Sequence, residues 1–317
     1  MKHLFIVNPK ARRLAGRVDE VVEDIRAFFL NHQQIQYDIH ITRWRRDAEG
    51  FVRRYVNGAV EIVRVYAVGG MGTFFEVING VVGLPNVQVT LFPFGIQNSF
   101  LHYFGQANGE RFLTLSNLVF ARCLSLDLIR CGNKFGAGFC LVGLEAMSAK
   151  TGKAIVDSFK FLSCKDTWTS VVYLCIGLYY MAQKKSIRQY RIDIDGNSFE
   201  GEYFTITIAN QPYCGGNMRS ALEARPDDGF IDIYITKPVP FHQRIQFSVD
   251  CLKSQYTKWP HLVSHYRGKR VSITSDVVMP ICFDGETFFD TAIHAEVVPH
   301  GIDFTGPIDI DSAGKDF

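Results

Sequence analysis

The stretch that most constrains the fold is a glycine-rich turn at residues 69–73, with the sequence Gly-Gly-Met-Gly-Thr. An apolar run at 62–68 leads into it, and an apolar segment with helical spacing follows it. This pattern predicts a strand, a tight turn and the start of a helix. Such glycines let the backbone approach a ligand closely, and a helix N-terminus directs N–H groups toward an anion. The turn therefore predicts a phosphate site, with a tight turn that binds nothing as the alternative.

Strands and helices alternate along the first third of the chain. Strands are predicted at 4–7, 37–41, 62–68 and 87–92, and helices at 18–29, 47–56, 74–82 and from 98 onward. This alternation predicts an N-terminal α/β domain over residues 1–122, with a parallel sheet and helices on both faces. Ligands of such sheets bind beyond the C-terminal ends of the strands. Asn8, Thr42, the turn at 69–73 and the segment 95–98 each follow a strand, so we expect them at one sheet edge.

The pattern changes after residue 122, where short strands replace the strand–helix repeats. Strands are expected at 126–129, 139–142, 190–194, 203–209, 231–235 and 271–273. A single long helix is expected near 166–184, and a second helix at about 241–254. Residues 123–298 are therefore predicted to form a mainly antiparallel, β-rich C-terminal domain.

Composition narrows the function classes. The 317 residues suggest two domains, and a net charge of +2 argues against a dedicated nucleic-acid binder. The eight cysteines form no C-x-x-C pair, which argues against zinc and suits free thiols in a reducing compartment. A cytoplasmic protein is therefore expected. The apolar segment 168–181 is too short to span a bilayer, and four basic residues follow it, so a buried or interfacial helix is predicted there.

Five motifs along residues 1–304 occur in the order found in a known family. They are Asn8-Pro9-Lys10-Ala11, the turn 69–73 with Phe75-Glu76-Val77-Ile78-Asn79-Gly80, Pro93-Phe94-Gly95-Ile96-Gln97-Asn98-Ser99-Phe100, Asp227-Asp228-Gly229 and Asp284-Gly285-Glu286. The chain resembles the diacylglycerol kinase catalytic domain family, which includes the bacterial soluble lipid kinases. In that family the last segment packs on the first domain, so the resemblance implies that residues 299–317 join residues 1–122.

The resemblance implies an ATP-dependent lipid kinase that transfers a phosphoryl group to a lipid hydroxyl, with ATP and Mg²⁺ as cofactors. It also implies a nucleotide and a lipid or lipid-like molecule as partners, peripheral membrane contact and no nucleic acid. Residues 1–122 would bind the nucleotide, and residues 123–298 would bind the lipid substrate. The implied nucleotide-binding residues are Asn8, Pro9, Lys10, Thr42, Gly69, Gly70, Gly72, Thr73, Glu76, Gly95 and Asn98.

Five positions carry the implied catalytic and metal roles. Glu286 matches the general base, and Asp127 matches a further family aspartate. Asp228, with the carbonyls of Arg225 and Phe230, matches a structural magnesium site of some bacterial members. The residues alone leave other interpretations open. Glu286 and Asp228 would then be turn carboxylates and Asp127 a polar strand residue, while Lys10 would belong to a solvated loop and Thr42 would be a helix cap.

Three departures from the family pattern concern its metal chemistry. Met71 and Ser99 stand where the family has aspartates, and Ile96 stands where it has threonine. Because magnesium requires oxygen ligands, these changes predict a weak metal site and impaired catalysis. A catalytically inactive nucleotide- or lipid-binding pseudokinase is therefore the first alternative. An NAD kinase-like enzyme, which shares the Gly-Gly-Asp-Gly turn, is the second, although the motifs at 93–100 and 284–286 favour the lipid kinases.

Overall fold

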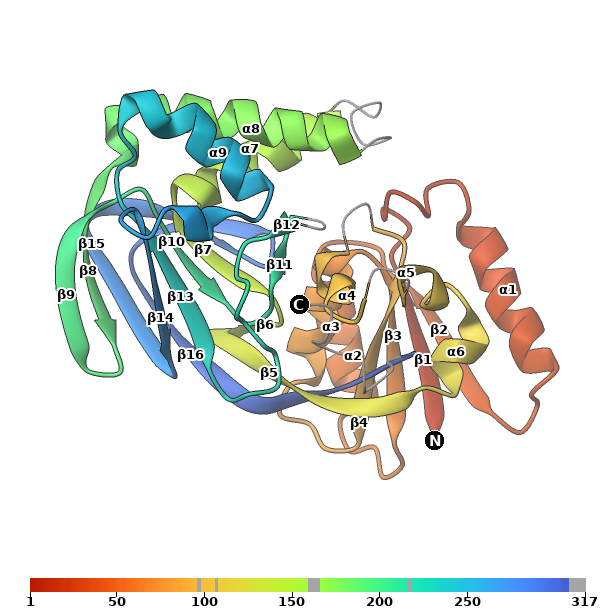
Figure 1. Cartoon of the computed structure of the whole chain (residues 1–317). Helices are drawn as coiled ribbons and strands as arrows, with labels where there is room; N and C mark the ends of the chain where they lie inside the picture. The colour runs from red at the N-terminus through yellow and green to blue at the C-terminus, as the bar shows by residue number, and fades with distance from the viewer. Residues whose placement is uncertain (96–97, 106–107, 159–165, 216–217, 308–317) are drawn as a thin grey trace. The chain divides into compact units, whose positions relative to one another are not determined.

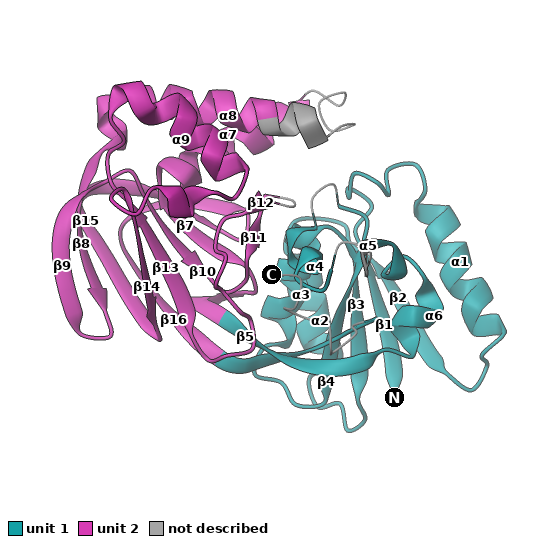
Figure 2. Ribbon diagram, viewed as in Figure 1, with its two compact units in different colours: residues 1–128, 299–317 teal, residues 129–298 magenta. Residues whose placement is uncertain are grey.

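The structure, a computed structural model, describes residues 1–95, 98–105, 108–158, 166–215 and 218–307. Its elements are drawn in Figure 1, and they form two compact units that Figure 2 colours separately. Unit 1 comprises residues 1–128 and 299–317, and unit 2 comprises residues 129–298. The division at 128/129 lies inside a strand, later than the predicted boundary at 122. The nucleotide role expected for the first domain and the lipid role expected for the second stay predictions.

Unit 1 is an α/β domain built on parallel strands. Its sheet has the order β4-β3-β1-β2, and each neighbouring pair is parallel. Strand β3 is buried along its whole length and β1 along nearly all of it, because helices cover both faces of the sheet (Figure 1). In chain order the elements are β1 (Lys2–Val7), α1 (Val18–Leu30), β2 (Gln36–Ile41), α2 (Asp47–Val56), β3 (Val63–Gly69), α3 (Met71–Val81), β4 (Val87–Pro93), α4 (Ser99–His102), α5 (Asn108–Arg111), α6 (Leu115–Val119) and β5 (Arg122–Cys131).

Strand β16 (Glu286–Gly306) returns the chain to unit 1. Its residues Asp303 and Phe304 pair in parallel with Gln88 and Val89 of β4. The Phe304 side chain is fully buried, with ring centroids 5.1–6.1 Å from four other phenylalanines: Phe74, Phe100, Phe104 and Phe112. Residues 299–306 therefore complete both the sheet and the aromatic core of unit 1.

Unit 2 is a mainly antiparallel β domain, so the predicted fold class is confirmed for both parts of the chain. Its strands follow the order β14-β13-β10-β7-β15-β16, and β8 and β9 extend from β15. Helices α7, α8 and α9 gather on one side of this sheet (Figure 1) and share an apolar cluster with it. The elements are β6 (Lys134–Gly136), β7 (Phe139–Gly143), α7 (Leu144–Ser158), α8 (Asp166–Ala182), η2 (Lys184–Ser186), β8 (Arg188–Ile194), β9 (Asn197–Tyr203), β10 (Thr205–Ala209), β11 (Tyr213–Cys214), β12 (Met218–Arg219), β13 (Ile231–Thr236), η3 (Phe241–Gln243), α9 (Arg244–Leu252), η4 (Tyr256–Lys258), β14 (Val263–Gly268) and β15 (Arg270–Phe283).

One prediction for unit 2 is wrong. Helix α8 was expected to be the single long helix, yet α7 spans fifteen residues directly before it. The sequence of α7 alternates small, polar and charged residues, and its buried positions include Ala146 and Ser148 rather than a stripe of large apolar side chains. Hydrophobic periodicity therefore gives a weak signal for this helix, which packs on the sheet through small residues.

Candidate functional site

The predicted phosphate turn connects β3 to α3 and packs against a second glycine turn. The carbonyl of Gly69 accepts a hydrogen bond from the Phe94 N–H at 2.7 Å, which holds the ends of β3 and β4 together. A Cβ atom on Gly95 would lie 2.7 Å from the Cα of Gly70. Contacts this short exclude any side chain at Gly95, so the two backbones can approach only because both residues are glycine.

Gly72 has a different environment from its neighbours. A Cβ atom added there would meet no described atom within 4 Å, apart from its chain neighbours and its own helix backbone. Gly72 lies in the first turn of the eleven-residue helix α3, where the leading N–H groups have no partner within the helix. Within the part of the chain that the structure describes, no side chain beside Gly72 hinders the approach of a negatively charged group to these N–H groups. We call the backbone of residues 69–73 and Gly95 the glycine cradle.

Asn8 connects the end of β1 to the cradle. Its Nδ2 donates to Thr73 Oγ1 at 2.9 Å, and its Oδ1 accepts from the Lys10 N–H at 3.0 Å. The Lys10 side chain is exposed and Pro9 is half-buried beside it. Thr42 is buried after β2, where its N–H donates to the Val7 carbonyl at 2.9 Å. The structure thus brings the strand ends at Asn8, Thr42 and Gly69 to one edge of the unit 1 sheet.

Asn98 adds a polar group next to Gly95. Its Nδ2 donates to the Gly95 carbonyl at 3.3 Å, while its buried Oδ1 has no hydrogen-bond partner among the described residues. Ile96 and Gln97, which lie between them, are outside the described residues. A buried carbonyl oxygen of this kind can accept a hydrogen bond from a ligand that enters the cradle.

The Glu76 side chain of α3 caps the N-terminus of helix α2. Its Oε1 accepts the Arg46 N–H at 2.9 Å at the start of α2, where Arg46 has a left-handed φ of 65°. A carboxylate at a helix N-terminus is stabilised by the unpaired N–H groups there. Burial nevertheless raises the pKa of the Glu76 carboxyl, which outweighs these donors. The structure therefore gives Glu76 a helix-capping role.

Asp127 is buried in unit 1, with 1 % of its side chain exposed. Its Oδ1 accepts the N–H of His300 at 2.9 Å. His300 has a left-handed φ of 52°, at the point where β16 enters unit 1. Asp127 thus stabilises the turn that brings the C-terminal strand to this sheet.

In unit 2 the Asp-Gly-Glu motif forms a tight hairpin turn between β15 and β16. Asp284 and Gly285 both have left-handed φ values, 44° and 88°. The Asp284 carboxylate accepts backbone N–H groups of Ala137, Gly138 and Phe139 at 2.8, 3.2 and 2.8 Å. Burial raises the pKa of this carboxyl, and the three N–H donors oppose that rise. This role of Asp284 does not follow from the sequence alone, because its partners lie about 145 residues earlier in the chain.

Glu286 follows this turn at the start of β16 and is half-buried. The Lys153 Nζ of α7 lies 3.5 Å from the Gly285 carbonyl, so a cationic group is fixed one residue from Glu286. The anchored Asp284 therefore holds the turn that carries the proposed base.

The expected magnesium site at Asp228 does not fit a metal ion. Its Oδ1 accepts the Phe230 N–H at 3.1 Å, and its Oδ2 pairs with the Arg267 guanidinium. That guanidinium also lies over the Phe230 ring, 4.4 Å from its centroid. Arg225 pairs with Asp227 at 3.1 Å. Within the described ranges, no group of three or more His, Cys, Asp or Glu side chains is arranged to hold a metal. An arginine cation thus takes the place beside Asp228 that a metal would need.

The two aspartate positions that the chain lacks are both helix starts. Met71 is the first residue of α3 and Ser99 is the first residue of α4, and both are half-buried. Neither supplies a carboxylate, so the residues here do not form a magnesium site with the oxygen ligands that the ion requires.

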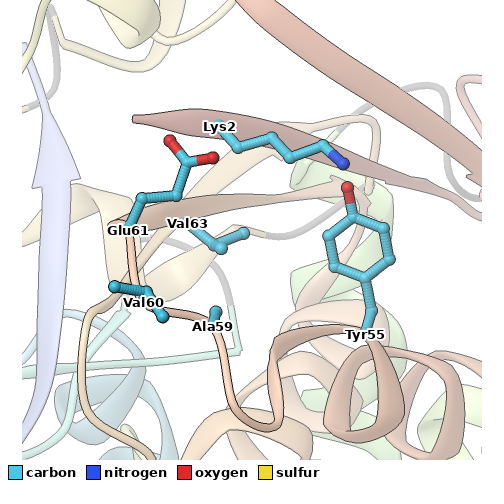
Figure 3. A pocket seen from close by; sticks show the side chains of 6 residues that line it. All are labelled: Lys2, Tyr55, Ala59, Val60, Glu61 and Val63. Carbon is cyan, nitrogen blue, oxygen red and sulfur yellow. The ribbon is translucent and has the colours of Figure 1, made fainter.

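A surface hollow of about 510 Å³ lies elsewhere in unit 1, at the starting ends of β1 and β3 (Figure 3). Its polar groups are already paired: Lys2 Nζ lies 2.9 Å from Asp38 Oδ2, and Tyr55 donates to the same carboxylate. The N-terminal amine pairs with Glu61 at 2.9 Å. Parallel sheets bind ligands at the opposite ends of their strands, so we do not assign the functional site to this hollow.

Two family models match the chain. The diacylglycerol kinase catalytic domain matches residues 2–131, and the YegS C-terminal NAD kinase beta sandwich-like domain matches residues 148–305. The chain thus combines a segment of the diacylglycerol kinase catalytic domain family, residues 2–131, with a YegS-type C-terminal domain, residues 148–305. The resemblance predicted from the motifs is therefore confirmed.

Curated relatives and solved structures agree with this assignment. Proteins of Staphylococcus aureus strains Mu3 and Newman, each named "Putative lipid kinase", are 25% identical over 276 residues, which is 83% of this chain and 85% of theirs. A crystal structure of a "putative diacylglycerol kinase from Bacillus anthracis str. Sterne" matches with a TM-score of 0.72 and 21% identity over 96% of each chain. This structural likeness supports the fold. Among the described helices, none is both long and apolar enough to cross a membrane.

Proposed function

We propose that this protein is an ATP-dependent lipid kinase of the diacylglycerol kinase type whose metal dependence is weakened. The observation that carries the proposal is the glycine cradle, where Gly72 leaves the N-terminus of α3 open to an anion. Bound ATP would supply the phosphoryl group for transfer. The α3 N–H groups and Asn8 would hold its phosphates, with Lys10 and Thr42 at the same sheet edge. The Oδ1 of Asn98, which has no partner among the described residues, would accept a hydrogen bond from a hydroxyl or amino group of the nucleotide.

Glu286 is the proposed general base for the lipid hydroxyl. A general base must accept a proton and keep its orientation while it does so. The rigid Asp284–Gly285 turn supplies that orientation, because three backbone N–H groups hold Asp284. No step is assigned to magnesium, since Met71 and Ser99 remove its expected ligands.

The same observations favour a second candidate, a nucleotide-binding pseudokinase. The cradle persists in this family member, while both of the family's aspartates at 71 and 99 are absent. Phosphoryl transfer depends strongly on charge neutralisation by metal ions and cations, so losing these ligands can abolish the rate without abolishing nucleotide binding.

Calorimetry with ATP separates these candidates when it is followed by a transfer assay. We expect ATP to bind, with an affinity that changes by less than about threefold when EDTA replaces Mg²⁺, because few oxygen ligands hold the ion. Transfer of labelled phosphate to diacylglycerol and a panel of other lipid alcohols then tests catalysis. Transfer abolished by Glu286→Gln supports the kinase, and ATP binding without transfer to any lipid supports the pseudokinase. A protein that binds no ATP contradicts both.

A further inference from the structure

The absence of aspartates at 71 and 99 changes the charge balance around the glycine cradle. The segments at the ends of β1 to β4 carry six cationic side chains and three carboxylates over residues 8–13, 42–49, 69–76 and 93–99. The cations are Lys10, Arg12, Arg13, Arg43, Arg45 and Arg46, and the carboxylates are Asp47, Glu49 and Glu76. With both aspartates the surplus of three positive charges would fall to one, and a bound Mg²⁺ would return it to three. These segments therefore have, without a metal, the net charge that the family pattern reaches with one.

Three of these cations lie in the connection between β2 and α2, which reads Arg-Trp-Arg-Arg at residues 43–46 and which we call the arginine loop. The side chains of Arg43 and Arg46 are exposed and form no ion pair with any described residue. Two carboxylates beside them bind the backbone instead. Asp47 Oδ2 accepts the Arg43 N–H at 2.9 Å, and Glu76 Oε1 accepts the Arg46 N–H at 2.9 Å. The backbone of the loop is thus held in place while these two guanidinium groups are available to an anionic ligand.

One side of α3 connects the arginine loop to the cradle. Gly72, Glu76 and Gly80 are spaced four apart, so they lie on the same side of the helix. Gly80 faces α2, because a Cβ atom there would lie 2.9 Å from the Glu49 carbonyl oxygen, and Glu76 faces the start of α2 through its bond to the Arg46 N–H. Gly72 lies about 6 Å further along this side, toward the N-terminus of α3. The open space at Gly72 therefore adjoins the arginine loop.

We propose that the arginine loop takes the place of Mg²⁺ at the cradle, with Arg43 and Arg46 binding the phosphates of the nucleotide. A guanidinium group binds phosphate oxygens through paired N–H donors and needs no carboxylate to hold it, unlike a metal ion. Cationic side chains can neutralise phosphate charge as metal ions do. This assignment explains how a site with Met71 and Ser99 can bind a nucleotide. It rests on the proposed function, because it names the cations of the same nucleotide site.

Calorimetry of the full chain tests the proposal with two ligands, ATP and inorganic tripolyphosphate, each in Mg²⁺ and in EDTA. Arg43→Gln with Arg46→Gln should lower the affinity for both ligands at least about tenfold in EDTA, because two charged hydrogen-bond donors are lost. Mg²⁺ should restore part of this affinity, since the ion then neutralises the phosphates, whereas the parent should change less than about threefold. Both backbone N–H groups of the loop remain, so thermal unfolding should show an intact fold.

Two matched variants separate the position of the charge from its amount. Arg26→Gln with Arg54→Gln removes the same charge from exposed positions of α1 and α2 outside the loop, and it should bind ATP like the parent. Arg43→Lys with Arg46→Lys keeps the charge and should stay within about fivefold of the parent in EDTA. Trp44 of the loop is 62% exposed and gives a second readout. ATP should change the tryptophan fluorescence of the parent, and Trp44→Phe should remove most of that change.

Three results would overturn the proposal. The first is equal ATP affinity of the parent and Arg43→Gln with Arg46→Gln in EDTA. The second is a loss of affinity that is the same in Mg²⁺ and in EDTA, which would indicate damage to the site rather than lost charge. The third is ATP binding that leaves the fluorescence of Trp44 unchanged. In each case the parent still binds ATP and the proposed nucleotide site stands, whereas a parent that binds no ATP would reject that site as well.

Discussion

The glycine cradle of unit 1 and the Asp227–Asp228 turn of unit 2 are both places where the family resemblance implies a cation. In the cradle the carboxylates at 71 and 99 are gone, while the close approach of Gly70 and Gly95 remains. At Asp228 the carboxylate remains, but Arg267 pairs with it. One region thus lacks the carboxylates expected from the resemblance, and in the other a guanidinium of the chain itself pairs with the carboxylate. In both regions the described residues offer a metal ion fewer free carboxylates than the resemblance implies.

The largest effect is expected from Gly72→Val, which tests the cradle directly. The new side chain would occupy the open space over the α3 N-terminus and should lower ATP affinity by about 100-fold or more, equivalent to about 2.7 kcal/mol. Folding should be almost unaffected, because a Cβ atom there would meet none of the described residues outside its own helix within 4 Å. Calorimetry measures the affinity and thermal unfolding checks the fold.

Two other glycines make this test specific. Gly50→Val in α2 is the matched control, since its Cβ would meet only the tip of the Arg54 side chain at 3.4 Å, and it should bind ATP normally. Gly70→Ala should instead destabilise unit 1, because its Cβ would lie 3.1 Å from the Gly95 Cα. If Gly72→Val binds ATP as well as the parent does, the cradle does not hold the phosphates.

Restoring the missing carboxylates should make ATP binding at the cradle depend on Mg²⁺. In Met71→Asp with Ser99→Asp, two added charges repel ATP phosphates unless Mg²⁺ lies between them. ATP affinity should therefore fall at least about tenfold when EDTA replaces Mg²⁺, and the single variants should show less, because the two groups serve one metal. Calorimetry with and without EDTA measures this difference.

The same double variant also tests whether the protein is a kinase or a pseudokinase. We expect it to transfer phosphate to a lipid faster than the parent, and Glu286→Gln should abolish that gain. A folded double variant that is inert on every lipid would favour a binding protein. An ordinary transfer rate in the unmodified protein would instead show that its metal site has been rebuilt from other residues.

Removing the cation at the second region should have a smaller effect, on stability. Arg267→Ala leaves the Asp228 carboxylate, whose side chain is 17% exposed, without its counter-charge. The free energy of unfolding should fall by about 1–2 kcal/mol. This is less than for a fully buried pair, because Arg267 is itself 46% exposed. Urea unfolding measures the loss, and adding Asp228→Asn to the same chain should recover most of it.

Lys269 supplies the matched control for Arg267. Its Nζ also lies over the Phe230 ring, at 5.4 Å, yet within the described ranges it pairs with no carboxylate. Lys269→Ala should therefore lower the free energy of unfolding only slightly. Adding Mg²⁺ to Arg267→Ala asks whether the vacated place accepts a metal, and the parent should show no stabilisation by Mg²⁺. If Mg²⁺ stabilises the parent, Asp228 binds metal despite Arg267 and the contrast between the two regions fails.

The sequence predicts unit 1 well because its buried parallel strands are mostly apolar segments, such as 63–68 and 87–92, that end in recognisable turns. The cradle could be predicted for the same reason, since all of its glycines lie next to strand ends. The pairing of Arg267 with Asp228 could not, because no spacing rule connects residues 39 positions apart. The anchoring of Asp284 depends likewise on strand neighbours that only the folded sheet brings together.

The smallest expected effect concerns Glu76, the carboxylate nearest in sequence to the cradle. Burial raises its pKa in the folded protein above the ordinary glutamate value of about 4.3. Because the folded state binds this proton more tightly, its contribution to stability is present below that ordinary value and is lost as pH rises through the raised pKa. Glu76→Gln should remove this part of the pH dependence, worth less than about 1 kcal/mol for a half-buried group, while its amide oxygen still accepts the Arg46 N–H. Urea unfolding of parent and variant between pH 4 and 7 measures it. Stability of the parent that instead rises with pH only when Mg²⁺ is present would show that Glu76 is a metal ligand, and the cradle would then have replaced its lost carboxylates rather than dispensed with them.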